Sequence, residues 1–232
     1  ITNAKDAVYL SMRYSEVEVT VENQVAIIKT TQLFRNDLGK DQKVKYGFPM
    51  PEDGSATELR YRVDGQWYLA KFSAIPPDTS LPAPGGEVHP NLEQYLGETP
   101  LYYNINETVR KDSSLIVELT YVQLLPYQFG TVTFSYPNDY SLIQPAFVDW
   151  LTLDFEISSD RTISNLELIG LEPSSLSVDG ESGELDFAAY ETEADFDYQV
   201  DYELSLDELG LFDMSIVLPD SVVPDAHGPG YF

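Results

Sequence analysis

Apolar and polar residues alternate along much of this chain, the pattern of a β-strand with one buried face and one exposed face. Residues 16–22 place three valines on one side of an extended backbone, with three glutamates and a threonine on the other. Residues 25–34 form a second run rich in β-branched side chains, and Asn23-Gln24 between the two runs suits a tight hairpin. Asp64-Gly65 is a stronger hairpin signal of the same kind. The opening part of the chain therefore reads as β-hairpins.

The same pattern recurs almost to the end of the sequence, separated by turn residues. Many short strands without intervening long helices favour β-sandwiches over βαβ units. We therefore predict an all-β fold of two antiparallel β-sandwich-like domains with little helix. The predicted strands are 16–22, 25–34, 58–63, 66–72, 101–109, 114–124, 131–136, 150–157, 163–168, 184–190, 195–205 and 212–218.

Residues 73–100 interrupt this pattern with six of the chain's 15 prolines. Because proline has no N–H to donate, such a segment cannot lie inside a sheet. We predict a long loop here, with one helical turn at 91–96. Residues 219–232 also have the composition of a linker, which would lead toward a downstream domain.

The charge is large and unevenly distributed. The chain has 39 acidic and 13 basic residues, a formal net charge of −26. Residues 1–136 hold 12 basic and 17 acidic residues (net −5), whereas residues 137–232 hold one basic and 22 acidic residues (net −21). This asymmetry, with a turn at Tyr136-Pro137-Asn138-Asp139, predicts a domain at 1–137, a strongly acidic second domain at 138–218, and a linker at 219–232.

Composition excludes several classes of function. The acidic charge argues against nucleic acid or an anionic membrane as partner, since phosphate binding needs clustered cations. The absence of cysteine excludes disulfides, zinc ribbons, iron–sulfur clusters and thiol nucleophiles. No apolar run is long enough to insert into a membrane, and no basic segment precedes an apolar run, so we expect any signal peptide to lie outside this sequence.

Calcium is the metal best suited to an acidic loop, because it prefers oxygen ligands. Asp179, Glu181 and Glu184 cluster with two glycines that permit sharp turns, and we name these three as candidate calcium ligands. The spacing does not fit an EF-hand, and a plain polar hairpin loop is the alternative. The two histidines, His89 and His227, lie in proline-rich loops, and we expect both to be solvent-exposed.

No catalytic motif stands out. The chain has no Gly-x-Ser-x-Gly element and no phosphate-binding loop, and among so many acids close carboxylate pairs will occur by chance. We therefore predict a protein that is not an enzyme. A carbohydrate-binding module is the alternative, and a glycan-active enzyme is less favoured. Sugar-stacking candidates are Trp67, Tyr68, Trp150 and the tyrosines of 95–103, all of which suit core or sheet-face positions as well.

Two short motifs carry a family resemblance. Thr31-Gln32-Leu33-Phe34-Arg35-Asn36 is followed closely by Tyr46-Gly47-Phe48-Pro49-Met50-Pro51, and the later run 109–125 has Tyr121 at a characteristic position. Together these resemble the VIT domain of vault proteins and inter-α-trypsin inhibitor heavy chains, over about residues 8–137. The family's middle segment is usually helical, whereas here it is the proline-rich 73–100 segment.

The resemblance implies a wider arrangement. In heavy-chain-like proteins a second β region and a von Willebrand factor A domain follow the VIT domain, and the strand order of 138–218 is similar to that β region. The metal motif of the A domain, Asp-x-Ser-x-Ser, does not occur here, so we expect that domain downstream in the parent chain. The resemblance implies a bacterial, extracellular or cell-surface interaction and adhesion scaffold, with a protein or matrix component as partner.

Overall fold

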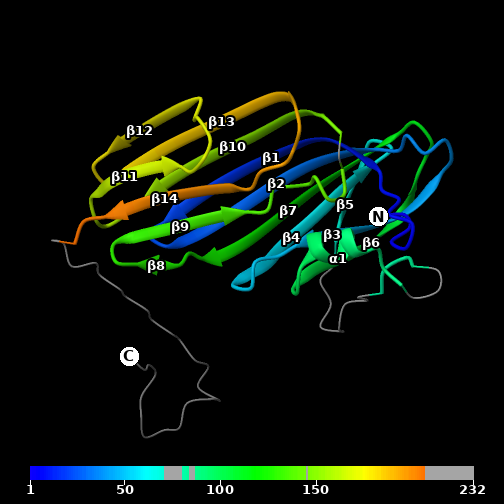
Figure 1. Ribbon diagram of the computed structural model, residues 1–232, viewed down its shortest axis with the longest axis horizontal. Helices are drawn as coiled ribbons and strands as arrows, with labels where there is room; N and C mark the ends of the chain where they lie inside the picture. Colours follow the sequence, from blue (N-terminus) through cyan, green and yellow to red (C-terminus); the bar gives the residue numbers. More distant parts are fainter. Residues whose placement is uncertain (71–79, 84–86, 145, 207–232) are drawn as a thin grey trace, which may run out of the picture.

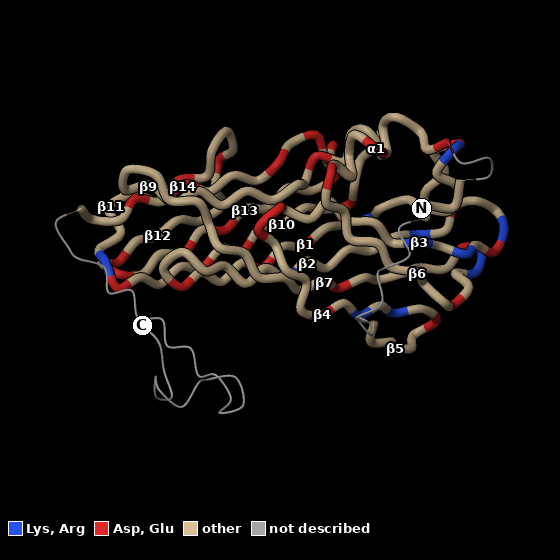
Figure 2. Tube along the Cα trace, turned by 90° about the horizontal axis from the view of Figure 1, so that it is seen from below, with Lys and Arg blue, Asp and Glu red and all other residues tan. Residues whose placement is uncertain are grey.

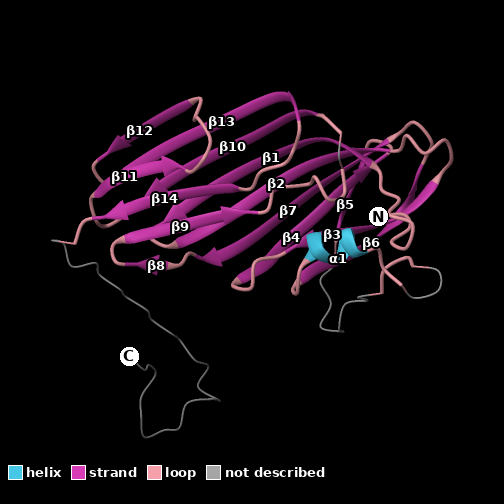
Figure 3. Cartoon of the chain, in the orientation of Figure 1, coloured by secondary structure: helices cyan, strands magenta, loops and turns pink. Residues whose placement is uncertain are grey.

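The computed structural model describes residues 1–70, 80–83, 87–144 and 146–206 (Figure 1). Within them the fold is almost entirely β, as predicted, with a single short helix (Figure 3). The predicted strand 212–218 and the predicted linker 219–232 lie outside the described residues. The elements are β1 (Ser11–Glu22), β2 (Val25–Arg35), β3 (Gln42–Pro49), β4 (Gly54–Val63), β5 (Gln66–Leu69), α1 (Pro90–Leu96), β6 (Pro100–Val109), β7 (Ser114–Leu124), β8 (Tyr127–Gln128), β9 (Thr131–Tyr136), β10 (Val148–Ser158), β11 (Ile163–Leu168), β12 (Ser175–Asp179), β13 (Ser182–Thr192) and β14 (Tyr198–Leu204).

One large sheet organises the molecule. Its eight strands run in the order β12-β13-β10-β1-β2-β7-β4-β5. All neighbours are antiparallel except β1 and β10, which pair in parallel from Tyr14–Trp150 to Glu22–Ser158. The hairpin predicted at Asp64-Gly65 joins β4 to β5, and both turn residues have positive φ (51° and 81°), as a type I′ turn requires.

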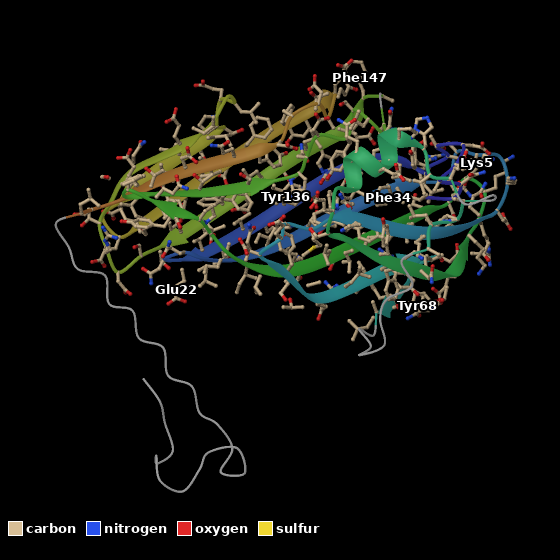
Figure 4. The ribbon with its side chains drawn as sticks, turned by 60° about the horizontal axis from the view of Figure 1, so that its bottom comes forward. Lys5, Glu22, Phe34, Tyr68, Tyr136 and Phe147 are labelled. Carbon is tan, nitrogen blue, oxygen red and sulfur yellow. The ribbon has the colours of Figure 1, made fainter. Side chains whose placement is uncertain are left out.

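Smaller elements cover one face of this sheet. The four-stranded sheet β11-β14-β9-β8 lies over one end, and the β3–β6 pair with α1 lies over the other (Figure 1). The core lies between the layers, where Phe155 of β10 contacts Phe134 of β9 and Tyr202 of β14, with ring centroids 5.6 and 6.4 Å apart. Figure 4 places Tyr136 near the middle of the molecule and Phe34 beside α1.

The boundary predicted at residue 137, between domains 1–137 and 138–218, does not separate two sandwiches. β10 from the acidic half pairs with β1 from the first half, and β14 pairs with β9. One hydrophobic cluster contains buried residues of both halves, so this part of the prediction is corrected: the described strands form one unit. The charge asymmetry does not mark a domain boundary because it concerns exposed positions. The buried positions of both halves contribute to the same core.

The helical turn predicted at 91–96 is present as α1. His89 caps its first turn by accepting a hydrogen bond from the backbone N–H of Asn91 at Nδ1 (3.3 Å), and Pro90 occupies the first helical position. Leu92 and Leu96 are buried against the segment around Ala4. His89 thus has a structural role, and His227 lies outside the described residues.

Candidate functional site

The residues that carry the family resemblance form a buried hydrogen-bond network rather than a reactive site. Gln32 accepts from the Tyr46 hydroxyl at Oε1 and donates to the Tyr140 hydroxyl from Nε2, both at 2.8 Å. Ser15 lies 3.4 Å from the same Tyr140 oxygen. Burial raises the pKa of Tyr46 well above its usual value, so the hydroxyl stays neutral at physiological pH. The glutamine therefore ties β2 to β3 and to the segment after β9.

The rest of the motif is also structural. The Asn36 side chain is fully buried and donates from Nδ2 to the carbonyls of Lys40 and Val109 at 2.9 Å, which closes the end of β2 onto neighbouring loops. Phe48 is fully buried, with its ring 6.0 Å from Tyr121 and 5.9 Å from Tyr136. These residues are buried and stabilise the covered side of the sheet.

A small cavity lies beside the Gln32 network. It measures about 60 Å³ and is bordered by Tyr9, Met12, Phe34 and Tyr95 together with Gln32. Ligand pockets for drug-sized molecules are typically about 300–1,000 Å³, so this space suits a few water molecules. This cavity is therefore too small to hold a drug-sized ligand.

The face of the large sheet opposite the covering elements is exposed along its whole width. Three aromatic side chains follow one row across β13, β10 and β1: Tyr190, Trp150 and Tyr14. The rings of Tyr14 and Trp150 stack, with centroids 4.4 Å apart and planes 13° apart, and Trp150 donates from Nε1 to Glu16 at 2.9 Å. Tyr190 is 71% exposed. We call this uncovered surface the open face.

Carboxylates dominate the next rows of the open face. Asp154 on β10 lies directly opposite Asp186 on β13, and Glu156 lies directly opposite Glu184. All four are exposed, and we call them the acidic ladder. The pKa of Asp154 is raised above its ordinary 3.8 by partial burial first, and then by Asp186, Glu156 and the other nearby carboxylates.

Basic residues near the acidic ladder are already paired with other acids. Lys29 on β2 donates to Glu18 at 2.8 Å, and Glu18 is the residue of β1 that neighbours Asp154. Arg60 pairs with Glu118 farther across the sheet and lies over the Trp67 ring at 4.9 Å. Figure 2 shows most lysines and arginines gathered toward β3, β5 and β6, with acids along the whole length.

An aliphatic patch occupies one corner of the open face. Val25 and Ile27 on β2 are each 50% exposed, and Leu124 on β7 is 62% exposed. Val25 lies directly opposite Leu124, so these side chains form one continuous apolar area. The open face thus combines aromatic, acidic and aliphatic areas, as protein-binding surfaces do.

The predicted calcium ligands lie at and beside the β12–β13 turn. Asp179 ends β12, Glu181 is in the turn, and Glu184 belongs to the acidic ladder. Among the described residues no group of three or more His, Cys, Asp or Glu is arranged to hold a metal ion. The geometry therefore adds no support for calcium, which stays a prediction.

The aromatic residues predicted as sugar-stacking candidates are divided between buried and exposed positions. Trp67 is 38% exposed on the open face, whereas Tyr68 stacks on Tyr61 with centroids 5.3 Å apart. Tyr95 is packed against Tyr140 at 5.9 Å. Sequence reasoning missed Tyr14 and Tyr190, because only the strand register shows that they flank Trp150.

The segment that contains Gln32 matches a known family. Residues 12–73 match the model of the vault protein inter-alpha-trypsin domain, or VIT domain. This chain contains a VIT domain. The matched VIT segment runs from β1 through β5 and includes Gln32, Asn36 and Phe48, so the VIT motif corresponds to packing positions on the covered side.

Solved structures extend the likeness of this VIT-containing chain beyond the matched segment. A Legionella pneumophila protein described as a "putative nutrient binding protein" aligns over 87% of this chain and 68% of its own, with 14% identity and a TM-score of 0.57. An M1 zinc metallopeptidase from Deinococcus radiodurans aligns over 84% of this chain and 42% of its own, with 8% identity and a TM-score of 0.46. The likeness to the Legionella pneumophila protein concerns the fold alone. No curated protein matches the chain.

In the described part of the chain no helix has the length and apolar character needed to span a membrane.

Proposed function

We propose that this chain is a non-enzymatic interaction scaffold of an extracellular or cell-surface protein, and that it binds a protein partner or matrix component through the open face. The observation that carries the proposal is the wide open face, which has exposed apolar side chains near both ends of its strands. Leu124 is 62% exposed beside Val25 and Ile27, which are each 50% exposed, and Tyr190 is 71% exposed at the other end of the strands. Contiguous exposed apolar area on a folded protein marks an interaction site.

The VIT match supports the same function. A VIT domain suggests a protein-interaction role, and the motif residues here are used for packing, which leaves the outer surface free to vary with the partner. The acidic composition would keep such an exposed surface soluble. A bacterial source and a von Willebrand factor A domain in the parent chain belong to this proposal as its wider setting.

A carbohydrate-binding module is the second candidate, because aromatic rings are exposed on the open face. Trp67 and Tyr190 are the two with the largest accessible share among the open-face aromatics named above. Sugar binding would require a ring face turned to solvent. A glycan panel that gives no binding at millimolar concentration would remove this candidate.

The test measures binding of the chain to a panel of purified extracellular-matrix proteins by interferometry. We expect at least one to bind, and a Trp67→Ala/Tyr190→Ala variant to weaken that binding about tenfold. Phe129→Ala is the matched control, because Phe129 is 98% exposed in the β8–β9 turn, away from the open face. Absence of any binding, or an equal loss in the control, would overturn the proposal.

A further inference from the structure

We infer that a cavity beside the β3–β6 pair binds a small organic dicarboxylate. The cavity measures about 380 Å³, within the range of about 300–1,000 Å³ that ligand pockets typically occupy. The β3–β6 pair lies over the covered side of the large sheet, so this site is separate from the open face and goes beyond the proposed function. The side chains that the argument uses are Lys43 and Lys45 of β3, Asn104 and Asn106 of β6, and Leu81 and Pro82 of the segment before α1.

The cavity has a basic lining in a strongly acidic protein. Lys43 and Lys45 are two residues apart on β3, so both side chains lie on the same face of the strand. Among the described residues that border the cavity there is no aspartate or glutamate. Glu107, the next residue after Asn106, is on the other face of β6, where it accepts from the Tyr61 hydroxyl at 2.5 Å. Because the whole chain has a net charge of −26, it can hold a small anion only where cations gather locally.

Lys45 contributes a buried positive charge to the cavity wall. This residue is only 4% exposed, a degree of burial that is rare for lysine. Its ammonium donates to the backbone carbonyl of Ser80 and lies 5.8 Å from the centroid of the Tyr102 ring. These two contacts fix the position of the ammonium, and neither of them supplies a full negative charge. The cation is therefore held in place before a ligand arrives, which lowers the entropic cost of binding.

A second cation lies along the same face of β3. The Lys43 ammonium donates to the backbone carbonyl of Asn106 at 2.6 Å, which places it next to that residue. Asn104 lies directly opposite Lys45 in the register of β3 and β6. Each lysine thus has an asparagine beside it. A carboxylate accepts hydrogen bonds from both ammonium and amide N–H groups, so each lysine–asparagine pair suits one carboxylate.

The distance between the two pairs selects a ligand with two anionic groups. Side chains at alternate positions of a strand are about 6.8 Å apart, so a single carboxylate or phosphate cannot occupy both positions. Two carboxylates joined by a short carbon chain can do so. Leu81 and Pro82 also border the cavity and offer apolar contact to that carbon chain.

The test titrates succinate into the whole chain by calorimetry. Butyrate and inorganic phosphate are the comparison probes, because each can occupy only one of the two positions. We expect succinate to bind, and each comparison probe to bind at least about tenfold more weakly. Added NaCl should weaken succinate binding, since the cavity is open to solvent, and saturating succinate should raise the Tm.

Variants of equal charge separate the cavity from general attraction to basic residues. Lys43→Gln/Lys45→Met removes both charges of the cavity, and we expect at least about tenfold weaker succinate binding. Lys40→Gln/Lys111→Gln is the control, because these lysines are exposed in the loops that flank β3 and β6 and do not border the cavity. Its affinity should change less than about twofold.

A further variant avoids the buried lysine, whose replacement can affect folding. Asn106→Asp changes an exposed residue of β6 and brings a negative charge next to Lys43. We expect it to keep the wild-type Tm without ligand and to bind succinate at least about tenfold more weakly. Melting of every variant without ligand shows whether it is folded.

Every other outcome overturns the inference. Absence of succinate binding would remove the site. An equal loss in Lys40→Gln/Lys111→Gln would mean general attraction to basic residues. Equal affinity for succinate, butyrate and phosphate would exclude two carboxylate positions. Normal succinate binding by folded Asn106→Asp would place any succinate site elsewhere. Matrix binding through the open face is measured separately, so failure of either proposal leaves the other standing.

Discussion

The two faces of the large sheet carry different kinds of side chain, although the same strands form both. On β10, Phe155 is fully buried among aromatic rings, while its neighbours Asp154 and Glu156 face solvent beside other acids. On β2, Gln32 is buried with both amide atoms hydrogen-bonded, while Val25 is left exposed at the corner. The covered face buries aromatic rings and a hydrogen-bonded amide, whereas the open face carries directly opposed carboxylates and exposed apolar side chains. The covered face therefore holds the core of the fold, and the open face is the one to which we assign binding in the proposed function.

The largest expected effect contrasts two adjacent positions of β10. Phe155→Ala removes a fully buried ring between Phe134 and Tyr202, and we expect the free energy of unfolding to fall by about 3–5 kcal/mol. Glu156→Gln, one residue away on the open face, should change it by less than about 0.5 kcal/mol. Urea unfolding measures both. Similar losses at the two positions would mean that the faces do not differ as described.

The next effect concerns the Gln32 network. Gln32→Leu keeps the side-chain volume but leaves the Tyr46 and Tyr140 hydroxyls without this partner, which should cost about 2–4 kcal/mol in urea unfolding. Adding Tyr46→Phe removes one orphaned hydroxyl, so the double variant should be more stable than the sum of the single variants predicts. Strict additivity would show that the hydrogen bonds to Gln32 carry little of the stability.

A gain in stability is expected from the open face. The ladder variant D154N/E156Q/E184Q/D186N removes two directly opposed like-charge pairs, and we expect about 1 kcal/mol of stabilisation, a rise in Tm of about 2–4 °C. The control E52Q/D53N/E87Q/E98Q lowers the net charge equally without touching a cross-strand pair. A lower Tm in the ladder variant, with the control unchanged, would contradict repulsion between the strands.

The smallest effect is a pH dependence. The pKa of Asp154 is raised in the folded state above its ordinary 3.8, so the native state binds more protons than the unfolded state between that value and the raised one. Stability from this group should therefore fall as the pH rises through that window. Asp154→Asn should flatten the fall, as measured by urea midpoints at closely spaced pH values. A wild-type profile that rises more steeply than the variant's would contradict the sign.

Much of the fold could be predicted from the sequence, because alternation and turn residues are local signals. The strands 114–124, 131–136 and 163–168 were predicted with the bounds observed, and the hairpin at Asp64-Gly65 and the helical turn at 91–96 are present. β3, β8 and β12 were missed. β12 has no buried residue, β8 is only two residues long, and β3 has a lysine-rich start and prolines near its end, which weaken the apolar pattern.

The candidate surface could be predicted only in part. Its acidic character follows from composition, but the opposition of Asp154 to Asp186 depends on the register of strands far apart in the chain. The same holds for Tyr14 and Trp150, which meet only because β1 and β10 pair. A single sequence does not show which strands become neighbours in a sheet. The predicted domain boundary at residue 137 is wrong for the same reason.

The parallel pairing of β1 with β10 has a consequence for the chain as it is synthesised. The ribosome completes residues 14–22 well before residues 150–158, their neighbours in the sheet. At about 5–20 residues per second the interval is on the order of 10 s. Throughout it, the β1–β2 hairpin exposes one row of unpaired backbone groups and three valines that later become core. A second nascent copy could pair with that edge, so crowding of polysomes should lower the yield of this protein more than its final stability suggests.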